Sequence, residues 1–209
     1  MYTQEPVDKK QFTEKFNQSY SQFAKAYDVV VKVFPVWRRW IRQVLPHIVG
    51  PEVLEISFGT GYLLTQYAND YRTSGIDYNW ELICTTKKNL QSSNVKATIQ
   101  QANVEFLPYA SGTFDTVVNT MAFSGYPDGQ RAMAEICRVI KPSGRLVMVD
   151  IDYPDNQNWL GMNLARMWAS SGDILRDMGK LFDQSGLSYE DKEVGGFGSV
   201  HLYVATKSA

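Results

Sequence analysis

The chain has 209 residues, of which 44% are hydrophobic and 21% charged, and this composition is typical of a folded globular domain. The length is enough for one domain with a full core and short for two. The net charge of −1 gives no electrostatic reason to expect nucleic-acid binding. We find no signal peptide and no apolar run of the roughly 18 residues that a spanning helix needs, so we expect a cytoplasmic protein.

Two cysteines occur, Cys84 and Cys137, and both fall in predicted helices. No second ligand lies near either of them at the spacing of a metal site, so we interpret both as ordinary reduced thiols and predict no metal.

The first 48 residues are predicted to form a helical cap. Phe12, Phe16, Tyr20 and Phe23 recur at helical spacing, which favours one or two helices up to about residue 28. A second helical stretch covers 29–48 and carries two tryptophans and three arginines between positions 37 and 42. Such a segment either packs its tryptophans on the rest of the protein or lies on a membrane surface, and the first alternative is favoured because the basic cluster is small.

Strands and helices then alternate. Strands are expected at 53–57, 73–76, 95–101, 114–119 and 145–150, with helices at 62–69, 80–91 and 128–140. Strict alternation predicts a parallel, doubly wound α/β sheet. After residue 153 the pattern changes to helices at 158–170 and 173–184 and strands at 187–193 and 199–206, whose short glycine-rich joint predicts an antiparallel pair. We therefore predict a single domain made of a cap (1–48), a ligand-binding core (49–153) and a lid with the terminal strands (154–209).

The stretch from Val53 to Leu64 predicts the ligand site. It reads as a buried strand, a turn containing Gly59 and Gly61, and the start of a helix, which is where open α/β sheets bind nucleotides. A dinucleotide site requires a third glycine, and Leu64 stands there instead. Glu55 precedes the turn, where a carboxylate suits an ammonium group better than a pyrophosphate. With Asp77 ending the next strand as a ribose acceptor, the pattern favours an adenosine with a cationic tail, such as S-adenosylmethionine.

Five ordered motifs support this choice. They are Glu55-Ile-Ser-Phe-Gly-Thr-Gly61, Gly75-Ile-Asp77-Tyr-Asn79, Asn103-Val-Glu-Phe-Leu-Pro108-Tyr109, Phe114-Asp-Thr-Val-Val118 and Arg138-Val-Ile-Lys-Pro-Ser-Gly144-Arg-Leu-Val147. Across about residues 50 to 150 the chain resembles the class I S-adenosylmethionine-dependent methyltransferases, and above all the ubiquinone/menaquinone-biosynthesis and phospholipid group. The resemblance implies a Rossmann-like seven-stranded sheet, with the last strand antiparallel, helices on both faces and an N-terminal helical cap.

The resemblance also implies which residues bind the cofactor. They would be Glu55, Ser57, Gly59, Gly61, Asp77, Tyr78, Asn103, Val104, Asn119, Thr120 and Tyr20. Glu55 would hold the methionine ammonium, Asp77 the ribose hydroxyls and Tyr78 the adenine face. Asn103 would accept a bond from the adenine amino group, or else serve only as a turn residue.

Ser57 is the one departure from the family pattern, which has glycine at this position. Its side chain is expected either to crowd the methionine tail or to bond the carboxylate of that tail. A role in packing against the sheet is equally compatible with the sequence.

Two candidate catalytic residues come from the same resemblance. His201 follows a Gly-Gly pair near the C-terminus, as in the quinone methyltransferases, and a neutral imidazole can accept a proton. Tyr27 resembles a tyrosine that precedes the core and could, like Tyr20, close over the cofactor. For all three residues a purely structural role is the alternative.

The expected acceptor is a small molecule, and the apolar residues of the cap and of the 158–170 helix favour a lipid-like or quinone-like one. Peripheral membrane contact is compatible with that acceptor. Two alternatives remain: a methyltransferase acting on protein or RNA, and a non-catalytic regulator that binds S-adenosylmethionine.

Overall fold

The computed structural model describes residues 2–15 and 35–209. Tyr20 and Tyr27 lie outside the described residues, as does most of the first predicted helix. Residues 9–15 are helical, so the structure contains the beginning of that helix.

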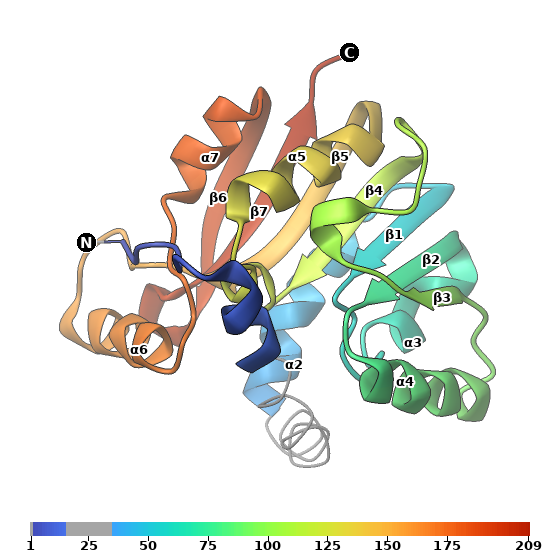
Figure 1. The fold of residues 1–209 in the computed structure, drawn as a ribbon, viewed down its shortest axis with the longest axis horizontal. Coiled ribbons are helices and arrows are strands. Elements are labelled where there is room, and N and C mark those ends of the chain that lie inside the picture. The colour runs from blue at the N-terminus through green and yellow to red at the C-terminus, as the bar shows by residue number, and fades with distance from the viewer. Residues whose placement is uncertain (1, 16–34) are drawn as a thin grey trace.

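A seven-stranded sheet forms the centre of the molecule (Figure 1). Its strands are β1 (Glu52–Ile56), β2 (Arg72–Asp77), β3 (Thr98–Gln101), β4 (Phe114–Thr120), β5 (Ile140–Ile151), β6 (Leu187–Gly195) and β7 (Val200–Lys207). They are ordered β3-β2-β1-β4-β5-β7-β6, and β7 runs antiparallel to both of its neighbours. The other pairings are parallel. The predicted fold class is therefore confirmed.

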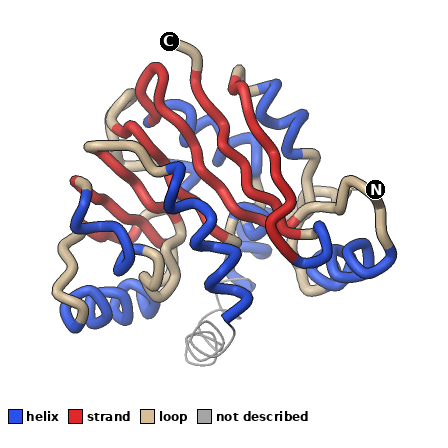
Figure 2. Tube along the Cα trace, turned by 180° about the vertical axis from the view of Figure 1, so that it is seen from behind, coloured by secondary structure: helices blue, strands red, loops and turns tan. Residues whose placement is uncertain are grey.

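Helices cover both faces of the sheet, as Figures 1 and 2 show from opposite sides. The helices are α2 (Pro35–Ile41), α3 (Leu64–Tyr67), α4 (Trp80–Ser92), α5 (Gly129–Val139), α6 (Trp159–Ser170) and α7 (Met178–Gln184). Short 3-10 turns are η1 (Arg42–His47), η2 (Ala68–Asp70), η3 (Val104–Phe106), η4 (Phe123–Gly125) and η5 (Gly196–Gly198).

The alternation of side chains along β5 explains the two layers. Leu146 and Met148 join the core formed with α5 and α7, whereas Val147 and Val149 join the core formed with η1, α3 and α4. All four side chains are fully buried, as expected for a strand that is covered on both faces.

Two predicted elements are shorter than expected. β3 begins at Thr98 because Asn94 adopts a positive φ of 53° and the chain from Val95 onward first closes the end of α4. α7 begins at Met178, where Asp177 caps the helix, because Ile174 and Leu175 instead bond to Ser124 and Thr3. These long-range bonds override the local helical pattern.

The N-terminal segment reaches the edge of the sheet at which the parallel strands end (Figure 1). Thr3 bonds to the backbone of Leu175, and Glu5 pairs with Arg176 at 3.0 Å. Lys9 pairs with Asp128 at 2.5 Å. Across residues 2–15 and 35–209, we find no helix with the length and apolar character needed to cross a membrane.

Candidate active site

The turn between β1 and α3 depends on two glycines in left-handed conformations. Gly59 has a φ of 58° and Gly61 a φ of 74°, which side chains with a Cβ rarely adopt. A Cβ on Gly61 would also lie 2.4 Å from the methyl group of Thr86 in α4. The turn is therefore held close to α4, and its backbone is exposed to a ligand at the carboxyl ends of the strands.

Asp77 ends β2 and connects that strand to the glycine turn. Its carboxylate accepts bonds from the backbone N–H of Gly59 at 2.9 Å and of Asn79 at 2.8 Å. Burial raises the pKa of Asp77 to about 6, although these backbone donors oppose the increase. The side chain is buried, but it lines a cavity.

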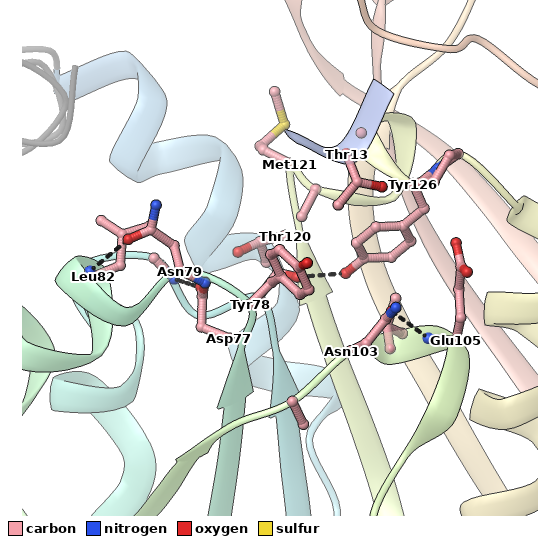
Figure 3. Close-up of a pocket in the computed structure, with 17 residues that line it drawn as sticks. Thr13, Asp77, Tyr78, Asn79, Leu82, Asn103, Glu105, Thr120, Met121 and Tyr126 are labelled. Carbon is pink, nitrogen blue, oxygen red and sulfur yellow. Dashed lines mark hydrogen bonds between the residues drawn. The ribbon is translucent and has the colours of Figure 1, made fainter. Parts of the chain in front are cut away.

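The cavity that Asp77 lines opens beside the glycine turn (Figure 3). It is the larger of two adjoining cavities at this turn, and we call it the larger cavity. Residues from the N-terminal helix, the glycine turn, the end of β2, the loop after β3 and the loop after β4 surround it. They are Thr13, Ser57, Gly59, Asp77, Tyr78, Asn79, Leu82, Ala102, Asn103, Val104, Glu105, Thr120, Met121, Ala122, Gly125, Tyr126 and Pro127. Seven of these residues were predicted from the sequence, namely Ser57, Gly59, Asp77, Tyr78, Asn103, Val104 and Thr120. Apolar residues that were not predicted, such as Met121, Ala122 and Pro127, form one wall.

A smaller cavity adjoins the first, and both are lined by Ser57, Gly59 and Thr120. Glu55 lines the smaller cavity together with Trp37 of α2. The Glu55 side chain is buried and accepts a bond from the Tyr67 hydroxyl at 2.8 Å. Burial raises the pKa of Glu55 to about 8, so its carboxyl group is protonated at neutral pH in the free protein. A cation that binds beside Glu55 would displace this proton. Each cavity thus contains one buried carboxyl group.

Tyr78, Asn103 and Val104, which were predicted to bind the cofactor, line the larger cavity. Tyr78 is 45% exposed and can cover a flat ring. The Asn103 amide oxygen accepts the backbone N–H of Glu105 at 2.9 Å, so this residue caps η3 and lines the cavity at once. Both alternatives considered for Asn103 are therefore compatible with the structure.

Asn119 does not line either cavity; its side chain is fully buried behind the glycine turn. Its amide nitrogen donates to the Tyr126 hydroxyl at 2.9 Å, and that hydroxyl lies 2.7 Å from the Ser57 hydroxyl. Tyr126 was missed from the sequence, since it stands in the loop after β4 with no motif to mark it. Ser57 has a φ of 55°, the conformation that favours glycine.

His201 lies apart from the cavities, on β7. It is 1% exposed, bonds Asp191 through Nδ1 at 2.7 Å and stacks on Tyr203. Although burial opposes protonation, the bond to Asp191 raises the pKa of the imidazole. The predicted role as a base gains no support from this position, and the role of Tyr27 cannot be judged because that residue is not described.

The two tryptophans of α2 pack inward, as the packing alternative expected. Trp37 contacts Trp40 and Trp168 of α6, with ring centroids 6.2 Å and 6.1 Å apart. Arg38 lies over the ring of Tyr62 at 4.8 Å. This helix covers the smaller cavity, and membrane contact through it stays a prediction.

The two cavities bring together residues that were predicted to bind the cofactor. Asp77, Tyr78 and Val104 line the larger cavity, and Glu55 lines the smaller one beyond the turn. Residues 54–148 match the family model described as a methyltransferase domain. This match and the curated relatives support a class I S-adenosylmethionine-dependent methyltransferase.

Curated relatives of the chain include the ubiquinone/menaquinone biosynthesis C-methyltransferase UbiE of Francisella tularensis subsp. novicida. It is 28% identical over 73% of the chain and 65% of its own length. The protein of the same name from Francisella philomiragia is 26% identical over 90% of the chain and 78% of its length. The chain thus spans about two thirds of the length of the first relative.

Solved structures show the same fold. An S-adenosylmethionine-dependent methyltransferase from Thermotoga maritima has a TM-score of 0.73 at 15% identity, over 90% of the chain and 98% of its own. At this identity the likeness concerns the fold alone.

Proposed function

We propose that this methyltransferase transfers the methyl group of S-adenosylmethionine to a ring carbon of a small, apolar, quinone-like acceptor. The observation that carries the proposal is the composition of the larger cavity. Asp77 stands at one side of it, and Met121, Ala122 and Pro127 form an apolar wall on the loop after β4. A nucleoside and an apolar ring can therefore lie in one continuous space.

In this proposal the cofactor extends across the glycine turn. Asp77 accepts the ribose hydroxyls, and Tyr78 and Val104 enclose the adenine in the larger cavity. The methionine ammonium approaches Glu55 in the smaller cavity. Thr120, which lines both cavities, would lie beside the sulfonium end of the cofactor, and the apolar wall would hold the acceptor.

Methyl transfer requires little of the protein beyond alignment of the cofactor and the acceptor. Methyl transfer from a sulfonium is an in-line displacement: the S–CH3 bond breaks, the C–CH3 bond forms and the sulfonium becomes a neutral thioether. The methylated ring carbon then loses its hydrogen as a proton to solvent, which restores the aromatic ring. The chain's residues need to align the nucleophile and keep water away. Apolar side chains such as Met121 and Leu82 exclude water, and Thr13 closes one side of the cavity.

The acceptor class also draws support from the relatives, which are named for quinone biosynthesis. Such acceptors partition into membranes, so we expect transient membrane contact during turnover. An acceptor on protein or RNA would need access across a polar surface, and Met121 and Pro127 argue against one at this position.

The test is turnover with a defined acceptor. The purified protein is incubated with S-adenosylmethionine and a prenylated 1,4-naphthohydroquinone with an unsubstituted ring carbon. We expect S-adenosylhomocysteine release and a product with a new carbon-bound methyl group by mass spectrometry. Methylation of oxygen only, or of added RNA or protein instead, would contradict the proposal. Binding of the cofactor without turnover of any acceptor would favour a regulator.

A further inference from the structure

Ser57 occupies a strained position that the rest of the turn fixes. Its φ of 55° is in the left-handed region, and its backbone N–H bonds the carbonyl of Ile76 at 2.8 Å. The side chain therefore has a defined direction, and its hydroxyl lies 2.7 Å from that of Tyr126. Glycine would be unstrained at this φ, so we expect the serine hydroxyl to contribute something that glycine cannot.

Tyr126 is held from several sides. Its ring packs edge-on against Phe123, with ring centroids 5.4 Å apart. Its carbonyl accepts a bond from the Arg176 guanidinium, and its hydroxyl accepts one from Asn119 at 2.9 Å. Figure 3 shows the ring projecting from the loop after β4 toward the glycine turn. The hydroxyl is therefore fixed in place at the cavity wall.

The Ser57 and Tyr126 hydroxyls together can donate one more hydrogen bond than the structure shows. The amide nitrogen of Asn119 can only donate, so it uses a lone pair of the Tyr126 oxygen. Ser57 and Tyr126 have two hydroxyl hydrogens, and one of them lies between the two oxygens. Among the described residues, neither hydroxyl has an acceptor for the second hydrogen. Burial raises the pKa of Tyr126, so the phenol stays protonated.

Both hydroxyl-bearing residues line the larger cavity, and Ser57 also lines the smaller one. We propose that the Ser57–Tyr126 hydroxyl pair donates a hydrogen bond to an oxygen atom of a bound ligand. This inference rests on the proposed function. The oxygen is a carboxylate or a phenolic oxygen, so it belongs either to the methionine end of the cofactor or to the acceptor ring.

The test compares Ser57→Ala, Tyr126→Phe and the double variant by calorimetry with two nucleosides. S-adenosylhomocysteine has the amino-acid end, and 5′-methylthioadenosine lacks it. The double variant is needed because either hydroxyl retains a hydrogen when the other is removed. Tyr109→Phe, whose hydroxyl bonds Gln100 and does not line either cavity, is the matched control.

If the oxygen is the cofactor carboxylate, the double variant binds S-adenosylhomocysteine about tenfold more weakly and 5′-methylthioadenosine as before. If the oxygen is on the acceptor, both nucleosides bind as before, and the KM for the naphthohydroquinone rises about tenfold. If one single variant reproduces the loss by itself, its hydroxyl is the donor; if neither does, each hydroxyl donates when the other is absent.

Unchanged affinities and an unchanged KM in the double variant would overturn the inference. Equal weakening of both nucleosides with a lower melting temperature would also overturn it, because it would show a structural role only. A wild-type protein that binds neither nucleoside would instead contradict the proposed function.

Discussion

The Asp77 carboxylate accepts the backbone N–H of Gly59 at 2.9 Å, which ties the end of β2 to the turn that follows β1. The two strands are adjacent and parallel, so their carboxyl ends lie at one edge of the sheet. The bond holds the turn in shape before a ligand arrives. It also aligns the carboxylate, whose remaining lone pairs can accept ribose hydroxyls.

Asp77→Asn should weaken the binding of S-adenosylhomocysteine by about tenfold to a hundredfold, because an amide is a poorer acceptor for two hydroxyls and lacks the charge. Calorimetry at neutral pH measures the loss. Asp70→Asn is the control, since that exposed residue in η2 lies outside both cavities. Equal affinities for Asp77→Asn and the wild type would show that the ribose binds elsewhere.

The raised pKa of Asp77 predicts how nucleoside binding depends on pH. Because the pKa of Asp77 is raised to about 6, the group is ionised above that pH and protonated below it. Affinity for 5′-methylthioadenosine, which lacks the ammonium that would meet Glu55, should be level above about pH 7 and fall below about pH 6, as the acceptor is lost. A titration by fluorescence or calorimetry follows it. Affinity that improves on acidification would contradict the assignment.

Glu55 should make the free protein less stable as pH rises. Its pKa is raised from 4.5 to about 8, so between these values the folded state holds a proton that the unfolded state has released. The free energy of unfolding therefore falls with rising pH across this window, by an amount on the order of a few kcal/mol. Asp77 and Asp152 contribute the same trend only up to about pH 6.

Glu55→Gln isolates this contribution. The amide oxygen can still accept the bond from Tyr67, and the side chain no longer titrates. Urea unfolding at several pH values above 6 should show a flatter dependence for the variant than for the wild type. Parallel curves would mean that Glu55 is already ionised in the folded protein.

Gly61→Ala should lower the free energy of unfolding by about 2 kcal/mol or more, since it combines a left-handed φ with a Cβ 2.4 Å from Thr86. Gly112→Ala is a matched control. Gly112 has a similar φ of 64° with no atom within 4 Å of the added Cβ, so only the backbone cost of about 1 kcal/mol remains. Equal losses in chemical denaturation would show that α4 does not press on the turn.

Arg176→Met should destabilise the loop after β4. The guanidinium bonds the carbonyls of Phe123 and Tyr126 and pairs with Glu5. Leaving partly buried carbonyls unpaired costs about 2 kcal/mol, measured as a loss in the free energy of unfolding. Arg131→Met, an exposed control, should lose much less. If Arg176→Met loses no more unfolding free energy than the control, Arg176 does not hold Tyr126 in place.

Much of this site could be predicted from local sequence. The strand, the two glycines and Asp77 follow one another at fixed spacing, so their chemistry is visible without the fold. Tyr126 could not be found in this way, because its partners Ser57 and Asn119 are 69 and 7 residues away and come together only in the sheet. His201 was selected by its sequence context, and the sheet places it beside Asp191 instead of at a cavity.

The most direct measurement is a crystal structure of the protein with S-adenosylhomocysteine bound. We predict ribose hydroxyls within hydrogen-bonding distance of Asp77, adenine between Tyr78 and Val104, and the amino-acid end passing Ser57 toward Glu55. A nucleoside bound outside the larger cavity, or with its ribose turned away from Asp77, would contradict the account.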